Sequence, residues 1–139
     1  MSLVVSDTTP LNYLILIGKI DVLPSLFGSV MVPPAVVSEM QHPKAPPVVA
    51  EWAGSPPQWL KIQSPLMRLN LSLGAGEEEA ISLAEEQGIG AILADDKKAR
   101  FEAKGRGIAT IGTIAILELA DLLKKHYGQP VSLRLAHPS

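Results

Sequence analysis

Short apolar runs alternate with longer amphipathic stretches along this chain. The apolar runs have the length of buried strands, and they lie at residues 3–6, 29–32, 91–94 and 108–111. Between them, hydrophobic residues recur at the spacing of helices. Because strands that alternate with helices are typical of a parallel sheet covered on both faces, we expect an α/β fold with a central parallel sheet.

Turn-forming residues set the limits of the predicted helices. Thr9 and Pro10 predict an N-cap and a first helical position, followed by a helix over residues 11–17. Gly88 closes the strongest pattern, a helix over residues 77–87. The remaining expected units, short or helical, lie at residues 20–26, 35–41, 97–104 and 113–126.

The stretch from residue 44 to residue 65 is the least regular part of the sequence. Five prolines interrupt it, and only residues 48–53 predict a helix. Trp52 and Trp59 indicate that it packs against the rest of the chain. Since 139 residues suit one domain and no repeat or low-complexity tract marks a boundary, we expect residues 1–139 to form a single domain.

Composition narrows the chemistry that is available. With 47% hydrophobic but only 4% aromatic residues, the core must be built from Val, Ile, Leu and Ala. The absence of cysteine excludes disulfides, thiolate metal sites and thiol nucleophiles. No signal peptide or membrane span is recognisable, so we expect a cytoplasmic protein with no membrane association. A net charge of −2 means that any polyanion must be held locally, by a basic patch or by metal ions.

Aspartates follow two of the predicted strands. Asp7 comes after residues 3–6, and the pair Asp95–Asp96 follows the strand at residues 91–94. In an open parallel sheet, ligands bind beyond the carboxyl ends of the strands, at the point where the strand order changes direction. If these two strands are neighbours, the carboxylates converge there.

Two further acids are candidates for the same place. On a helical wheel, Glu77 lies roughly 40° from the centre of the buried stripe, whereas Glu78 and Glu79 lie roughly 140° and 120° away. The wheel therefore predicts that only Glu77 points inward and that the other two complement the positive helix N-terminus. Glu39 lies on a helix that is too short for the wheel to decide its direction.

Several carboxylates in one pocket raise each other's pKa, and a divalent cation offsets this repulsion. Oxygen ligands without cysteine or an organised histidine set favour Mg²⁺ or Mn²⁺ over Zn²⁺. Such an ion lowers the pKa of bound water and neutralises charge on a phosphodiester, so the acids indicate phosphate chemistry. The basic residues after the acidic pair are either solvated helix charges or contacts for a nucleic-acid backbone. They are Lys97, Lys98, Arg100, Lys104 and Arg106.

Five motifs in order resemble the PIN domain family, and within it the small prokaryotic branch that includes toxins of the VapC type. They are VVSDTTPLNYL, VPPAVVSEM, LGAGEEEAI, ILADDKKAR and IGTIAIL, and they span the chain from Val4 to about Leu123. The resemblance implies a three-layer α/β/α sandwich and metal-dependent ribonuclease activity. It also implies an RNA substrate, a small antitoxin partner and a homodimer, for which Leu14, Ile17 and the proline-rich segment are candidate contacts.

Carried over by position, the family's catalytic acids fall on Asp7, Glu39 and Glu77. For the fourth acid, the usual Thr-x-Asp pattern favours Asp96, but Ala94 replaces the threonine and Asp95 is equally available, so both stay open as metal ligands. The remaining matched residues are expected to bind substrate, with Arg100 either neutralising an acid or contacting phosphate. They are Thr8, Lys97 and Arg100.

Two other classes of protein compete with the nuclease. Receiver domains that accept a phosphoryl group also gather aspartates at strand ends, but their acidic pair comes early, and here it comes late. A PIN-like module that binds RNA or protein without cleaving it remains open, because the same fold carries different functions. Metal binding that is lost in Asp7→Asn favours the enzyme, and metal-independent RNA binding favours the module.

Overall fold

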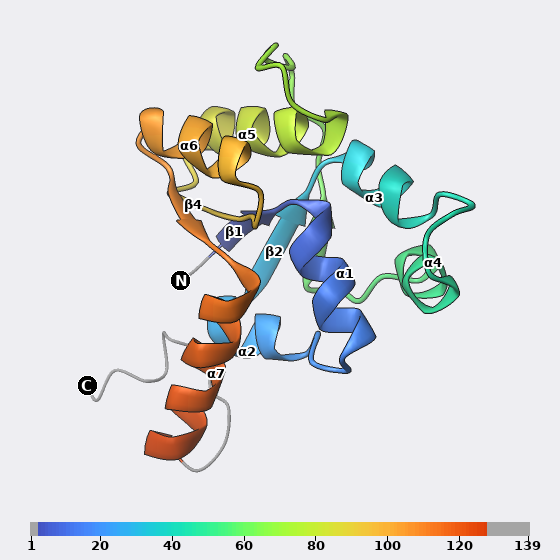
Figure 1. Ribbon diagram of the computed structural model, residues 1–139, viewed down its shortest axis with the longest axis vertical. Helices are drawn as coiled ribbons and strands as arrows, with labels where there is room; N and C mark the ends of the chain where they lie inside the picture. Colours follow the sequence, from blue (N-terminus) through green and yellow to red (C-terminus); the bar gives the residue numbers. More distant parts are fainter. Residues whose placement is uncertain (1–2, 128–139) are drawn as a thin grey trace.

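The computed structural model describes residues 3–127 as a parallel sheet between two layers of helices (Figure 1). The strands are β1 (Leu3–Ser6), β2 (Ser29–Val32), β3 (Leu60–Ile62), β4 (Ala91–Leu93) and β5 (Ala109–Ile111). The helices are α1 (Thr8–Leu16), α2 (Val22–Phe27), α3 (Pro34–Met40), α4 (Pro47–Gly54), α5 (Ala75–Gln87), α6 (Lys97–Gly105) and α7 (Thr113–Tyr127).

The strand order explains where the aspartates meet. The five strands run parallel in the order β3-β2-β1-β4-β5. The chain therefore builds one half of the sheet outward from β1 and then returns to build the other half from β4. Because β1 and β4 are neighbours, with Val5 opposite Ile92 and Ser6 opposite Leu93, the change of direction lies between them.

The core has two parts, one on each face of the sheet. Successive residues of a strand point to opposite faces, so Val4 and Val5 of β1 enter different clusters. Val4 packs with the apolar residues of α1, α2, α3, α4 and α7, and Val5 packs with those of α5 and α6. Figure 1 shows α5 and α6 side by side on one side of the sheet. This confirms the predicted α/β/α sandwich with a central parallel sheet.

One strand escaped the sequence pattern. β3 lies inside the proline-rich stretch in which only a helix was expected. It pairs with β2 at the edge of the sheet, and only Leu60 of its three residues is buried. A three-residue edge strand has no alternation long enough to register as a pattern, and prolines are tolerated beside it.

The helices next to Asp7 and Glu77 start earlier than the sequence predicted. α1 begins at Thr8 with Asp7 as its N-cap, so the prediction of Thr9 at that position is wrong. α5 begins at Ala75 with Gly74 as its N-cap, two residues before the predicted start. In both places the N-cap residue has an extended conformation and the first helical turn follows it directly.

The candidate dimer contacts separate into a core residue and a surface residue. Leu14 is fully buried in the core, so the expectation that it contacts a second copy is wrong. Ile17 is 53% exposed and lies near the equally exposed Tyr13 and Leu16. Leu14 lies on the side of α1 that packs into the core, and the opposite side of the helix is exposed to solvent.

Among the helices of residues 3–127, none has the length and apolar character needed to cross a membrane.

Candidate active site

The candidate acids lie along the edge of the sheet that is formed by the carboxyl ends of its strands, beside the inner strands β1 and β4. The Asp7 backbone N–H donates to the Leu93 carbonyl at 3.0 Å, which ties the end of β1 to the end of β4 just before Asp95 and Asp96. Helices α3 and α5 pack against each other over this edge. They bring Glu39 and Glu77 to it from two other parts of the chain.

Asp7 is the most deeply buried of these acids. Asp7 is only 3% exposed. This burial raises the pKa of its carboxyl group to about 7. The Thr8 backbone N–H offsets part of the shift, while the negative charges of Glu77, Glu39 and Asp96 add to it. A carboxylate that is hidden from water and faced by three other acids is poised to bind a proton or a cation.

Glu77 is half-buried in the same group of charges. Its pKa is raised chiefly by burial and further by the charges of Asp96 and Glu39, and it is lowered by a hydrogen bond from the Gly74 backbone. That bond, at 3.2 Å, caps the first turn of α5 with the helix's own acid. One oxygen of Glu77 thus fixes the helix start while the carboxylate stays beside the other acids.

Glu39 is held by two contacts that tie three elements together. Its Oε1 accepts a hydrogen bond from the Thr8 hydroxyl at 2.5 Å, and its Oε2 accepts one from the Gly76 backbone N–H at 3.0 Å. Thr8, which was expected to bind substrate, donates its hydroxyl hydrogen to this carboxylate in the structure. The two bonds join α1, α3 and α5 at the acid site.

The two adjacent aspartates have different surroundings. Asp95 accepts the Thr113 backbone N–H at 2.8 Å and the Thr113 hydroxyl at 2.6 Å, so both of its oxygens hold the start of α7. Asp96 caps α6 through the Ala99 N–H at 3.1 Å and is exposed. Its charge is among those that raise the pKa values of Asp7 and Glu77. By its effect on these pKa values Asp96 interacts with Asp7 and Glu77, whereas the oxygens of Asp95 are both bonded to Thr113.

The wheel prediction for Glu78 is wrong. Glu78 is 4% exposed because residues 68–73 fold back over it, and its carboxylate accepts bonds from the Arg68 side chain and from the Leu71 and Leu73 backbone. The two backbone bonds, followed by the one from Arg68, lower its pKa. A wheel places a residue relative to the helix's own apolar stripe, and it carries no information about a loop that covers the other side.

The basic residues expected at the site are arranged unevenly. Lys97 is exposed at the start of α6, directly after Asp96. Arg100 donates from one guanidinium nitrogen to the Ala94 carbonyl at 3.2 Å, and within residues 3–127 it forms no ion pair with an acid. Of its two proposed roles, neutralising an acid therefore has no contact to support it.

The donor set fits a divalent cation by its chemistry. Four carboxylates supply oxygen ligands only, and a bound cation would favour the charged forms that burial and mutual repulsion oppose. Among residues 3–127, however, no three Asp, Glu or His side chains already surround one point as metal ligands do. An ion would have to draw the carboxylates closer together.

Two contributors to this site were not predicted from the sequence. Glu79 accepts the Ala35 N–H at 3.2 Å and so fixes the first turn of α3, the helix that carries Glu39. Gly76 leaves room for the Glu39 carboxylate against α5. Gly76 is part of the LGAGEEEAI motif, but a glycine is needed there because of its contact with Glu39, which is 37 positions away. No local pattern reveals such a contact.

Comparison with known proteins identifies a family and a similar solved structure. A family model described as DUF3368, a PIN domain, matches residues 3–127. A PilT N-terminus domain protein from the hyperthermophilic archaeon Sulfolobus solfataricus P2 has a similar structure, with a TM-score of 0.60 and 20% sequence identity over 86% of this chain and 92% of that chain. At this identity the likeness shows a shared fold. A comparison with curated proteins finds no match.

Proposed function

The chain belongs to the PIN domain family, and from this premise we propose that it is a Mg²⁺- or Mn²⁺-dependent endoribonuclease that hydrolyses phosphodiester bonds of RNA. PIN domains are in general metal-dependent nucleases that use divalent ions. The observation that carries the proposal is the meeting of four carboxylates from four elements at the change of strand direction, with Asp7 buried among them.

In this proposal each acid has its own part in holding the ion. Asp7, buried at the centre, would be the ligand whose charge gains most from a cation. Glu77 and Asp96 flank it from α5 and α6, and Glu39 approaches from α3. A bound Mg²⁺ or Mn²⁺ supplies a water of lowered pKa and positive charge beside the phosphate.

Other residues of the chain would position these acids. Thr8 and Gly76 hold the Glu39 carboxylate, and Gly74 holds one oxygen of Glu77. Such outer contacts orient metal ligands and raise their affinity. Lys97, directly after Asp96, can bind the phosphate backbone of the substrate.

The test is cleavage of a mixed pool of structured RNA by the purified protein. Cleavage in Mn²⁺ that disappears in EDTA and in Asp7→Asn supports the proposal. Wild type and variant that are both folded and equally inert in Mn²⁺ overturn it.

We extend the proposal to the VapC-like branch, in which the protein would be a cytoplasmic toxin silenced by a small antitoxin and would form a homodimer. The exposed Tyr13 and Leu16 of α1, with Ile17 directly after the helix, offer an apolar surface for a second copy. Light scattering of wild type and Ile17→Glu tests the dimer: a dimer that becomes monomeric in the variant supports this surface. A wild type that is monomeric at micromolar concentration contradicts it.

A second candidate function is a PIN-like module that binds RNA or a protein without cleaving it. It is favoured by one observation: within the described residues, no group of three acids is already arranged as a metal site. RNA binding that is unchanged by EDTA, together with no cleavage in Mn²⁺, distinguishes this module from the nuclease.

A further inference from the structure

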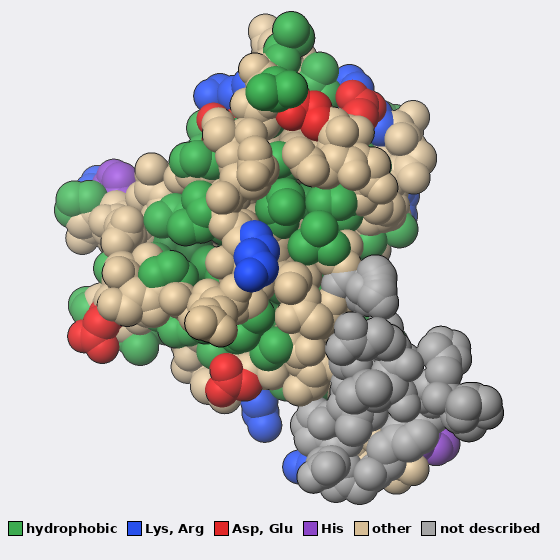
Figure 2. All heavy atoms as spheres, turned by 180° about the vertical axis from the view of Figure 1, so that it is seen from behind, with side chains coloured by type: hydrophobic (Ala, Val, Ile, Leu, Met, Phe, Trp, Pro, Cys, Tyr) green, Lys and Arg blue, Asp and Glu red, His purple; other side chains and the backbone are tan. Residues whose placement is uncertain are grey.

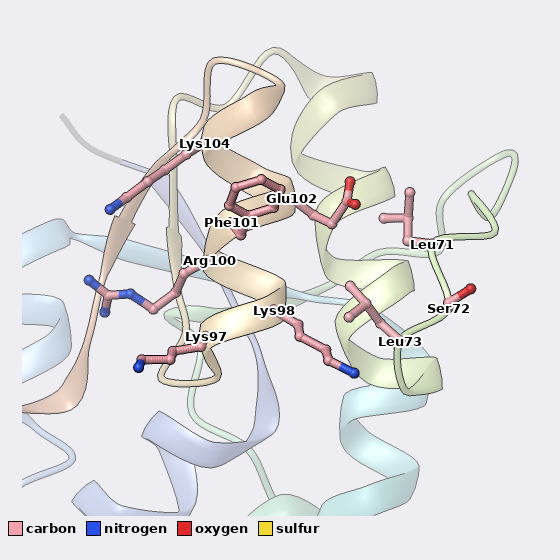
Figure 3. A pocket seen from close by; sticks show the side chains of 9 residues that line it. All are labelled: Leu71, Ser72, Leu73, Lys97, Lys98, Arg100, Phe101, Glu102 and Lys104. Atoms are coloured by element: carbon pink, nitrogen blue, oxygen red, sulfur yellow. The ribbon is translucent and has the colours of Figure 1, made fainter.

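A pocket of about 660 Å³ lies on α6, which begins directly after Asp96, and it is lined by apolar and basic side chains together with Ser72 and Glu102. At its centre Phe101 is 76% exposed, although it is one of only two phenylalanines in the chain. Figure 3 shows the Phe101 ring on α6, with Leu71 and Leu73 across the pocket, Glu102 between the ring and Leu71, and Lys104 extending to the other side. Because the ring is exposed to solvent, it gains little of the stabilisation that burial of an aromatic side chain provides.

The lysines of α6 surround the exposed ring. Lys97 and Lys104 lie four residues before and three residues after Phe101, so they share its side of the helix, and Lys98 lies one turn before it. The stripe from residue 97 to residue 104 is about 10 Å long. Within residues 3–127 these three lysines form no ion pair, so their charges are free for a ligand.

The opposite wall of the pocket is built and held in place. Leu71, Ser72 and Leu73 form it, and Ser72 has a positive φ of 59°, a conformation that a serine adopts at some cost. The buried Glu78 fixes both flanking residues, because its Oε2 accepts the Leu71 and Leu73 backbone N–H groups at 3.0 and 3.1 Å. A wall secured by a buried acid gives the pocket a defined shape.

The surface of residues 3–127 carries other exposed apolar groups, of which Leu66 is the most exposed. The tip of the loop between β3 and α5 carries the exposed Leu66 and Met67 and projects from the molecule, with hydrophobic side chains at its end (Figure 2). Nothing around that tip indicates a ligand. The α6 pocket differs because a flat ring, free cations and an apolar wall meet in one place.

We propose that this pocket binds a single-stranded segment of the RNA substrate, with one base stacked on Phe101 and backbone phosphates on Lys97, Lys98 and Lys104. The inference rests on the proposed nuclease function, because it assigns the path by which RNA reaches the acids. An aromatic face stacks on any base, and lysines around it neutralise the adjoining phosphates. Since α6 begins directly after Asp96, a strand lying along the helix enters the acid site at its Lys97 end.

The test measures binding of a fluorescent single-stranded RNA by anisotropy, with the full chain in EDTA so that no metal-dependent cleavage occurs. Phe101→Ala should weaken binding by about 5- to 150-fold, the loss expected for one base stack, and Phe101→Trp should restore it. Leu122→Ala is the matched control, because it removes another exposed hydrophobic side chain from a different helix, α7. It should leave binding unchanged.

A second RNA of the same length without bases separates stacking from charge. Wild type should bind this abasic strand about as weakly as Phe101→Ala binds the normal strand, and Phe101→Ala should no longer distinguish the two strands. Equal affinities of wild type and Phe101→Ala for normal RNA overturn the inference, as does a wild type that binds no RNA. A protein segment would then be the occupant to test.

The outcomes for the pocket and for the nuclease can be told apart. If RNA binding depends on Phe101 but Mn²⁺ gives no cleavage, the pocket stands and the nuclease proposal fails. If Mn²⁺ gives cleavage that Asp7→Asn abolishes while Phe101→Ala binds RNA like wild type, the nuclease stands and the pocket is overturned.

Discussion

The carboxylate of Glu39 lies in the space that a side chain at position 76 would need. A Cβ on Gly76 would meet Oε1 at 2.7 Å and Oε2 at 2.8 Å, closer than carbon and oxygen approach without displacement. The Gly76 backbone N–H also donates to Oε2 at 3.0 Å. An acid of α3 is thus seated on the first turn of α5, next to Glu77, because residue 76 has no side chain.

Gly76→Ala should therefore impair the site without weakening the fold. The added methyl group displaces Glu39, and we expect metal affinity and cleavage to fall by about 10- to 100-fold, as for other residues that orient metal ligands. Alanine is favoured over glycine within a helix by about 1 kcal/mol. The melting temperature should therefore not fall in proportion to the loss of metal affinity. Calorimetric Mn²⁺ titration and thermal unfolding measure the two effects.

Gly105→Ala is the matched control for this change. Gly105 also lies in a helix, but a Cβ there meets nothing within 4 Å. The control should bind Mn²⁺ like wild type, and a Gly76→Ala variant that does the same would refute the role given to the Glu39 contact.

The extent to which the sequence predicted this protein depends on the range of the contacts. Parallel strands with aspartates at their ends were recognisable because each signal lies within about ten residues. The seating of Glu39 on Gly76 and the covering of Glu78 by residues 68–73 were not, because they join segments that only the fold brings together. The same limit left Asp95 and Asp96 open, since their difference lies in the distant Thr113.

Asp7→Asn should stabilise the metal-free protein at neutral and higher pH. Burial raises the pKa of Asp7 from 3.8 to about 7, so between these values the folded state binds a proton that the unfolded state has lost. Stability then falls as pH rises through this window, by up to about 4 kcal/mol. The asparagine variant lacks this loss, and its advantage should be largest near pH 8 and vanish towards pH 4.

Urea unfolding in EDTA at pH 5 and pH 8 measures this difference. Asp21→Asn, which changes an exposed aspartate, should show no comparable dependence on pH. The explanation fails if Asp7→Asn is no more stable than wild type at pH 8. Addition of Mn²⁺ should raise the stability of wild type and not that of Asp7→Asn.

Asp95→Ala and Asp96→Ala should have similar effects on stability and different effects on function. Each removes an acceptor for a helix N–H, from Thr113 or from Ala99, and should cost about 0.5 to 2 kcal/mol. Only Asp96→Ala should lose Mn²⁺-dependent cleavage. Thermal melts and RNA cleavage distinguish the two, and cleavage that is lost in Asp95→Ala but kept in Asp96→Ala would reverse the assignment.

Glu78→Gln should release the loop that forms one wall of the α6 pocket. A neutral amide accepts hydrogen bonds more weakly than the carboxylate that holds Leu71 and Leu73, so their backbone amides should exchange hydrogen faster. Hydrogen exchange followed by mass spectrometry measures this, with Glu85→Gln as the control. Unchanged exchange at both leucines would contradict the anchoring role.

The pH dependence of this anchor has the opposite sign to that of Asp7. The backbone bonds from Leu73 and Leu71 and the bond from Arg68 hold the pKa of Glu78 below its usual value. Its contribution to the loop is therefore present above that usual value and is lost as pH falls through the lowered pKa. Protection of the loop in wild type should decline only in acid.

The most direct test of the acid site is Mn²⁺ binding itself, followed by the loss of the electron paramagnetic resonance signal of the free ion. Wild type should bind Mn²⁺ saturably and release it to excess Mg²⁺, Asp7→Asn should lose this binding, and Asp95→Asn should keep it. Wild type that leaves the free-ion signal unchanged, or Asp7→Asn that binds Mn²⁺ as wild type does, would contradict the account of these four carboxylates as a metal site.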